Sequence, residues 1–186
     1  MRWVTLYARS RQVPAAFAAL LVGTAGVWGL SGDVWSPILA ALALTCGIAV
    51  AAIGLSGQDV DLDRTAAMPW VPRRLAHVVL IGALAGGAVL AAQSFGTPHV
   101  EMSIITRDAF GMLGLTGIAA TVAGGQYGWT LPLAWFAIAP LVPPRDVSAK
   151  VVAWMLQPSG TPAATWTAVI LGVTGIVAYS GWGGRR

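Results

Sequence analysis

The sequence has little charge for its length. Only 10% of its 186 residues are charged, whereas an ordinary soluble domain carries about 25%. Hydrophobic residues make up 56% of the chain and the mean hydropathy is +0.73. A soluble domain of this size could not cover its surface with so few charges, so the composition predicts an integral membrane protein. The apolar residues form continuous blocks, which predicts an all-α protein and not a barrel.

Cysteine and lysine are also scarce. The single cysteine, Cys46, lies inside an apolar block, which excludes an intrachain disulfide and leaves the compartment open. Ten arginines accompany one lysine in a chain rich in alanine and glycine, a composition typical of a high-GC bacterium. The net charge of +4 is best interpreted as membrane topology and contact with anionic lipid. We therefore expect a bacterial inner-membrane location and no nucleic-acid partner.

Several catalytic motifs are missing. No Gly-x-x-x-x-Gly-Lys-Ser/Thr loop occurs, so this chain cannot hydrolyse ATP by that route. Gly-Leu-Ser-Gly occurs twice, at 29–32 and 54–57, but no histidine lies in a late apolar block to serve as a base for serine. The expected spans contain no charged residue, which argues against ion-coupled transport. These absences predict no catalytic residue and no cofactor in this chain.

Six apolar blocks predict about six transmembrane helices in a single transmembrane domain, residues 1–186. Their approximate ranges are 13–30, 37–55, 75–92, 109–124, 130–142 and 163–182. Ser36 is a good N-cap and Pro37 a good first helical residue for the second span. Regularly spaced glycines in the third and fourth spans predict closely packed faces; they are Gly82, Gly86, Gly111, Gly114 and Gly117.

Three parts of the chain are harder to assign from the pattern. The fifth block is short and contains Pro132 and Pro140, so it is either a kinked full span or a re-entrant segment. Residues 143–162 are expected to hold an external amphipathic helix on or in the membrane. The residues that give it this pattern are Val147, Val151, Trp154 and Met155.

The N-terminal residues 1–12 are basic and aromatic, which predicts a helix lying in the membrane interface. Its aromatic rings would lie at headgroup level and its arginines toward phosphates. The membrane-interface residues are Arg2, Trp3, Tyr7, Arg9 and Arg11. The alternative is the charged region of a cleaved signal peptide.

Residues 54–77 form a polar interruption between the second and third spans. Of the chain's 11 basic and seven acidic residues, three of each kind lie in it: Asp59, Asp61, Asp63, Arg64, Arg73 and Arg74. With six spans and both termini in the cytoplasm, eight basic residues lie inside and three outside, so this topology fits the positive-inside rule. We therefore expect the 54–77 loop to be cytoplasmic and to bind a soluble partner.

The aspartates at 59, 61 and 63 could instead hold Mg²⁺ and a diphosphate substrate, as in membrane-embedded transferases. The longer Asp-rich signatures of such enzymes are absent, and a solvated or helix-capping role explains the same residues. We therefore predict no metal ligand in this chain.

The layout resembles the membrane subunits of ABC-2 type transporters. The matching positions are the basic helix at 1–12, the loop at 54–77 and the external segment at 143–162. The resemblance implies six spans and a cytoplasmic coupling helix seated on a separate ATPase subunit, which supplies ATP and Mg²⁺. It also implies a second permease copy or a homologous permease. It places the ATPase dock at the six charged residues of the loop, with Trp70 as an apolar anchor.

The sequence thus predicts the transmembrane subunit of an ATP-driven transporter for an amphiphilic or lipid-like substrate, in contact with membrane lipid. One alternative is a Mg²⁺-dependent, membrane-embedded lipid-modifying enzyme that uses the three aspartates. A third is a non-enzymatic membrane scaffold or immunity protein.

Overall fold

The computed structural model describes residues 13–31, 34–55, 70–97 and 99–184. Every regular element in these ranges is a helix, and no strand occurs among them. The expected all-α class is confirmed for this part of the chain. The interfacial helix proposed at 1–12 and most of the 54–77 loop lie outside the described residues.

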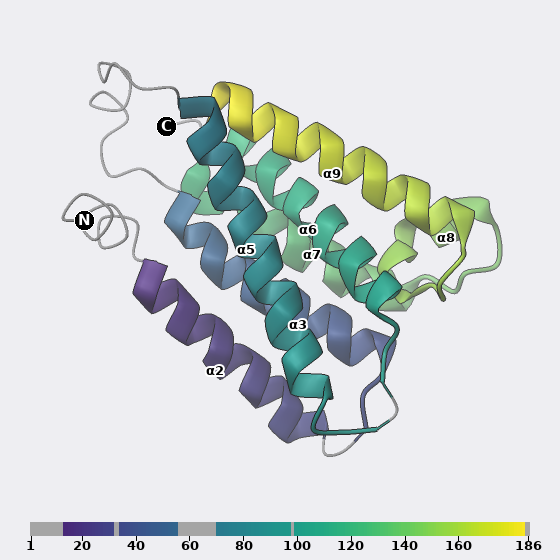
Figure 1. The fold of residues 1–186 in the computed structure, drawn as a ribbon. Helices are drawn as coiled ribbons and strands as arrows, with labels where there is room; N and C mark the ends of the chain where they lie inside the picture. The colour runs from purple at the N-terminus through teal and green to yellow at the C-terminus, as the bar shows by residue number, and fades with distance from the viewer. Residues whose placement is uncertain (1–12, 32–33, 56–69, 98, 185–186) are drawn as a thin grey trace.

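Five long helices run roughly along one direction (Figure 1). They are α2 (Val13–Ser31), α3 (Pro37–Ala52), α5 (Trp70–Gln93), α6 (Met102–Ala123) and α9 (Pro162–Trp182). The 3₁₀ turn η1 (Ile53–Leu55) extends α3. As expected, Ser36 caps α3 by accepting a hydrogen bond from the N–H of Leu39 at 3.4 Å, and Pro37 is the first helical residue.

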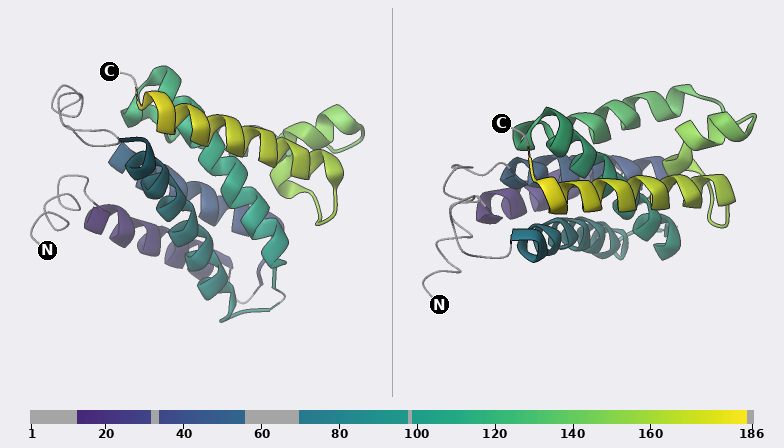
Figure 2. Two further views of the ribbon diagram at one scale, coloured as in Figure 1. Left: turned by 45° about the horizontal axis from the view of Figure 1, so that its top comes forward. Right: turned by 90° about the horizontal axis from the view of Figure 1, so that it is seen from above.

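The helices define two ends of the molecule. At the loop end, α2 and α5 begin and α3, α6 and α9 end; at the turn end, α2 and α5 end and α3, α6 and α9 begin (Figures 1 and 2). The helices α2, α3, α5 and α6 therefore alternate in direction. In contrast, α6 and α9 run parallel. Two contacts in the same order along both helices show this: Phe110 lies against Gly172, and Gly117 lies against Gly175.

A run of short elements returns the chain from the end of α6 to the start of α9. They are η2 (Gly125–Tyr127), α7 (Thr130–Ile138), η3 (Ala139–Leu141), α8 (Val147–Val152) and η4 (Trp154–Leu156). The turn η2 packs against η1 at the loop end, and η3 packs against η4. Together α7 and η3 cover about 20 Å, less than the ~30 Å of a bilayer core.

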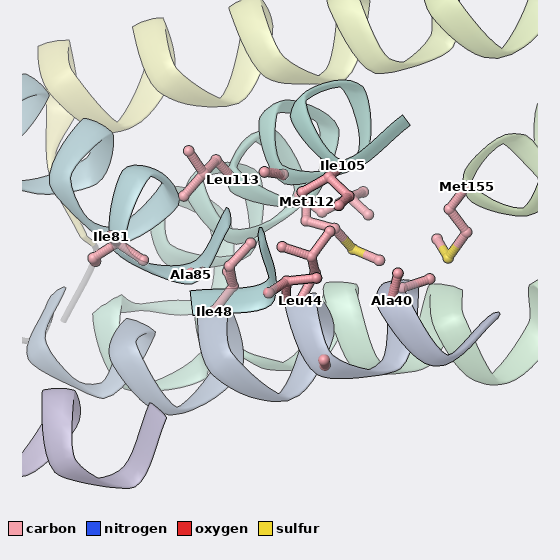
Figure 3. Packing of buried hydrophobic residues seen from close by; sticks show 14 of the residues in the cluster. Ala40, Leu44, Ile48, Ile81, Ala85, Ile105, Met112, Leu113 and Met155 are labelled. Carbon is pink, nitrogen blue, oxygen red and sulfur yellow. The ribbon is translucent and has the colours of Figure 1, made fainter. Parts of the chain in front are cut away.

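Small residues let the helices approach closely. A Cβ on Gly114 would overlap the backbone of Leu171, and one on Gly175 would overlap that of Gly114. A Cβ on Gly82 of α5 would overlap Leu113 of α6, so this glycine lies on the face of α5 that packs against α6. The packed glycine faces predicted from spacing are thus present. Around them, large apolar side chains such as Leu44, Ile48 and Met112 fill the core between α3, α5 and α6 (Figure 3).

Two expected boundaries are wrong. The third span begins at Trp70 and not near Leu75, so Arg73 and Arg74 lie on a helix and not in a loop. The fourth helix begins at Met102, after the N-cap Glu101, and not at Ala109. It therefore contains Arg107 and Asp108.

The expected amphipathic helix at 147–155 is also wrong as a continuous element. The helix α8 ends at Val152, and Ala153, at φ −91° and ψ 27°, leaves helical geometry. Val147 remains exposed, whereas Trp154 and Met155 turn inward and are fully buried. The side chain of Met155 reaches toward Ala40 on α3 (Figure 3).

Two helical stretches of the described chain are long and apolar enough to cross a membrane by length and composition. They are Val71–Gln93 in α5 and Pro162–Trp182, which is α9. The apolar helices Pro14–Leu30 and Pro37–Ala52 are shorter. The outward faces are apolar as well: Val22, Ile170 and Val177 are among many large hydrophobic side chains that are exposed.

Candidate functional site

The structure describes only part of the predicted dock. Trp70, Arg73 and Arg74 occupy the first turns of α5 at the loop end, with Arg73 exposed and Arg74 half-buried. The remaining predicted dock residues Asp59, Asp61, Asp63 and Arg64 lie outside the described residues. The same is true of the predicted interface residues Arg2, Trp3, Tyr7, Arg9 and Arg11.

Arg74 has a structural partner at the loop end. The helix α9 ends at Gly183, whose φ of 73° favours glycine and whose N–H donates to the carbonyl of Tyr179 at 2.8 Å. A Cβ on Gly183 would lie 2.7 Å from Cζ of Arg74, so the guanidinium covers this helix end. A cation at a helix C-terminus is electrostatically favourable. Arg74 therefore joins the start of α5 to the end of α9.

The other side of the 56–69 connection is also joined to α9. The buried hydroxyl of Tyr179 donates a hydrogen bond to the carbonyl of Leu55 at 3.1 Å. Leu55 is itself buried and is the last described residue before the connection. The residues on both sides of the 56–69 connection thus contact the last turns of α9: Leu55 before it and Arg74 after it.

The turn end holds a buried ion pair that sequence reasoning missed. Nε of Arg107 lies 2.9 Å from Oδ1 of Asp108, and the two side chains are 7% and 1% exposed. The guanidinium also donates to the carbonyls of Gln157 at 3.0 Å and Pro158 at 3.3 Å. Arg107 therefore ties α6 to the segment that leads into α9, and Asp108 compensates its buried charge.

The segment 153–158 follows the surface of α6 beside this pair. The indole ring of Trp154 lies on Gly111, where any Cβ would overlap it. The side-chain amide of Gln157 donates to the carbonyl of Ala153 at 3.3 Å and stabilises the turn between them. The connection between α5 and α6 is closed by Gln93. Its side-chain oxygen accepts from the N–H of Val100 at 3.0 Å, and its side-chain nitrogen donates to the carbonyl of Val100 at 3.1 Å.

One signal in the sequence could have found the ion pair. The apolar block at 109–124 is too short for the roughly 20 residues that cross a bilayer. Extending it toward the N-terminus, as far as the break at Pro98, brings Arg107 and Asp108 into the helix. The contact with Gln157 and Pro158 is some 50 positions away in the chain, and no local pattern predicts it.

Acidic residues do not gather into a metal site in the described ranges, where no group of three His, Cys, Asp or Glu is close enough to hold an ion. Asp146 caps α8 by accepting from the N–H of Ala149 at 2.7 Å and from the hydroxyl of Ser148 at 2.8 Å. These hydrogen bonds lower the pKa of the Asp146 carboxyl. Its role is therefore helix capping.

Comparisons with known proteins add no relative. The chain gives no significant match to protein-family models, to curated proteins or to solved structures. Any functional assignment therefore depends on the residues and geometry described above.

Proposed function

We propose that this chain is the transmembrane subunit of an ATP-driven transporter of the ABC-2 type, placed in the bacterial inner membrane with six crossings and both termini in the cytoplasm. It would work as a homodimer or beside a related permease and move an amphiphilic or lipid-like substrate. The ATPase, with its ATP and Mg²⁺, would be a separate subunit.

The exposed surface supports the membrane location. A soluble monomer rarely exposes large continuous apolar areas, yet Trp166, Ile170 and Val177 on α9 are each at least 60% exposed. Exposed aromatic side chains lie near both ends of the molecule, as in the aromatic belts of membrane proteins. They are Trp28, Phe95 and Trp166 toward the turn end and Tyr127, Trp129 and Trp182 toward the loop end.

The helix order supports a return of the chain between α6 and α9, which six crossings require and to which α7 and η3 contribute about 20 Å. Because α7 and η3 carry the chain back from the loop end, α9 can run parallel to α6 and end beside it. The start of α2, the flanks of residues 56–69 and the end of α9 then share one side. This is the arrangement that the distribution of basic residues favours.

The observation that carries the partner assignment is the construction of the loop end. Tyr179 fixes Leu55, and Arg74 covers the end of α9. The two flanks of the 56–69 connection, which is charged in sequence, are therefore held by the same helix, α9. A platform of this kind suits a loop that must transmit force from a docked subunit, because a loosely held loop would absorb the movement.

Co-purification tests the proposal. The tagged full chain is expressed in its own host, extracted in mild detergent and assayed for ATP hydrolysis, and its partners are identified by mass spectrometry. We expect a second chain that carries a phosphate-binding loop. If no ATPase accompanies the protein under conditions that keep it folded, the proposed function is wrong.

The triple substitution Asp59→Asn, Asp61→Asn and Asp63→Asn separates the alternatives, with Asp146→Asn as the matched control at the opposite end. A coupling loop loses the ATPase in the triple variant only. A lipid-modifying enzyme retains its partners but loses Mg²⁺-dependent turnover. A scaffold responds to neither assay.

A further inference from the structure

The buried carboxylate of Asp108 uses only one of its two oxygens. Oδ1 accepts from Arg107, whereas Oδ2 has no hydrogen-bond partner among the described residues. A buried carboxylate oxygen without a partner is costly, and such a group usually marks an ordered water or a functional site. In the proposed topology α6 crosses the membrane, where an ionisable residue marks a functional site.

Helix geometry shows where Asp108 projects. Gly111 lies about 60° to one side of Asp108 around the helix axis and Met112 about 40° to the other. Trp154 of η4 covers Gly111, and Met112 lies 3.9 Å from the hydroxyl of Thr45 on α3, measured to Sδ. Asp108 therefore projects between η4 and α3.

Two unpartnered donors border the same region. The indole Nε1 atoms of Trp154 and Trp35 are buried and have no acceptor among the described residues. Both indoles are buried; Trp154 lies in η4, and Trp35 precedes α3, the helix against which η4 packs. Asp108 and Trp154 thus belong to two elements in contact, α6 and η4, and each carries one buried polar atom without a partner.

We propose that Asp108 is a buried proton-binding site, in which a water molecule held by the indole N–H of Trp154 connects Oδ2 to the exchangeable protons of the turn end. Such a water accepts from the indole and donates to the carboxylate, which satisfies both orphaned groups. This role does not require the ATPase partner.

The charges balance in a simple way. With the carboxylate ionised, Arg107 and Asp108 together are neutral, as burial requires. When Oδ2 takes up one proton from solution through the water, the pair gains one positive charge. The carbonyls of Gln157 and Pro158 continue to hold the guanidinium, so proton uptake changes the electrostatics of the link between α6 and α9.

The other ionisable groups on elements packed against α6 lie elsewhere. Cys46 is in the middle of α3, and α7 and η4 carry none. Toward the loop end are Arg73, Arg74 and His77 on α5, Tyr179 on α9 and Tyr127 on η2. On α6 itself, the exposed N-cap Glu101 lies about two turns before Asp108, and Arg107 is the charged group in contact with Asp108.

Infrared difference spectroscopy of the purified full chain in lipid nanodiscs, recorded across a pH titration, tests the proposal. A protonated carboxylic acid has a carbonyl stretch that is well separated from the carboxylate bands. Each of the chain's seven Asp and Glu carboxyls gives such a band when it is protonated, so the Asp108 band is identified as the component that is lost in Asp108→Asn and retained in Asp146→Asn. If Asp108→Asn removes no such component, the proposal is overturned.

A second variant covers the case in which Asp108→Asn fails to fold. Trp154→Phe keeps the ion pair and an aromatic ring on Gly111 but removes the N–H that holds the water. We expect the Asp108 band to shift in frequency and midpoint in Trp154→Phe and to stay unchanged in Trp166→Phe, which alters an exposed indole on α9. Equal spectra for the two variants would exclude the water-linked site.

Discussion

Arg107 and Asp108, neighbours in the chain, form a 2.9 Å ion pair inside the helix bundle, and the arginine extends from it to two backbone carbonyls of the segment before α9. A buried pair contributes little to stability when both partners are present, but breaking it leaves an uncompensated charge. The pair therefore makes each of its members intolerant of single substitution.

For this reason Arg107→Met should lower the free energy of unfolding by about 3–5 kcal/mol. The double variant Arg107→Met with Asp108→Leu should recover most of that loss, because no charge remains buried. Reversible denaturation in detergent measures both. Arg145→Met, at an exposed arginine of the turn end, is the control and should change little. A single variant as stable as this control would refute the assignment.

The backbone contact between α6 and α9 makes a second prediction. Gly114→Ala places a methyl group on the backbone of Leu171, and overpacking of this kind costs about 1–3 kcal/mol. Gly181→Ala on α9 meets nothing within 4 Å and should not destabilise the protein. Thermal unfolding of the two variants compares them directly. Equal melting temperatures would mean that the helices are not in contact at Gly114.

The hydrogen bond from Tyr179 to Leu55 can be removed with little change of shape. Tyr179→Phe should reduce the free energy of unfolding by about 0.5–1.5 kcal/mol. It should also expose the 56–69 connection to protease more readily, since one of its flanks is released. Tyr127→Phe, at an exposed tyrosine of the same end, is the control. Identical cleavage rates for the two variants would show that the hydrogen bond does not fix the loop.

Thiol labelling tests the proposed orientation. In a Cys46→Ser background, Gln126→Cys places a thiol at the loop end and Ser159→Cys places one at the turn end, both at exposed positions. A membrane-impermeant maleimide should label intact cells only through Ser159→Cys. Gln126→Cys should react only after the membrane is permeabilised. The reverse pattern would invert the topology.

Local signals were sufficient to predict most helices. Ser36 and Pro37 placed the start of α3, and the apolar block at 163–182 placed α9 to within one residue, because caps and continuous apolar blocks are properties of neighbouring residues. The glycine faces followed from spacing for the same reason. The sequence predicted that successive spans alternate in direction, but it did not predict which spans touch. The contact of Gly117 on α6 with Gly175 on α9 forms because the chain returns through α7 before α9 begins.

The site was harder to predict because its cause is not local. Arg107 and Asp108 carry the charges typical of a connection, and they become helical and buried because carbonyls about 50 positions away accept hydrogen bonds from the arginine. The helical spacing of Val151, Trp154 and Met155 was real, yet the chain bends at Ala153 so that the Trp154 ring lies on Gly111. Packing in three dimensions overrode both patterns.

The glycine face of α6 has a consequence for how the protein is made. This helix is buried along most of its length, and its cover, α9, is synthesised only after residues 124–161. At typical rates of translation this delay is about 2–8 s. During that interval Gly114 and Gly117 lack their native contacts on α9, so this face of α6 stays open or is covered by a temporary partner. Assembly of this fold is therefore completed by its last helix.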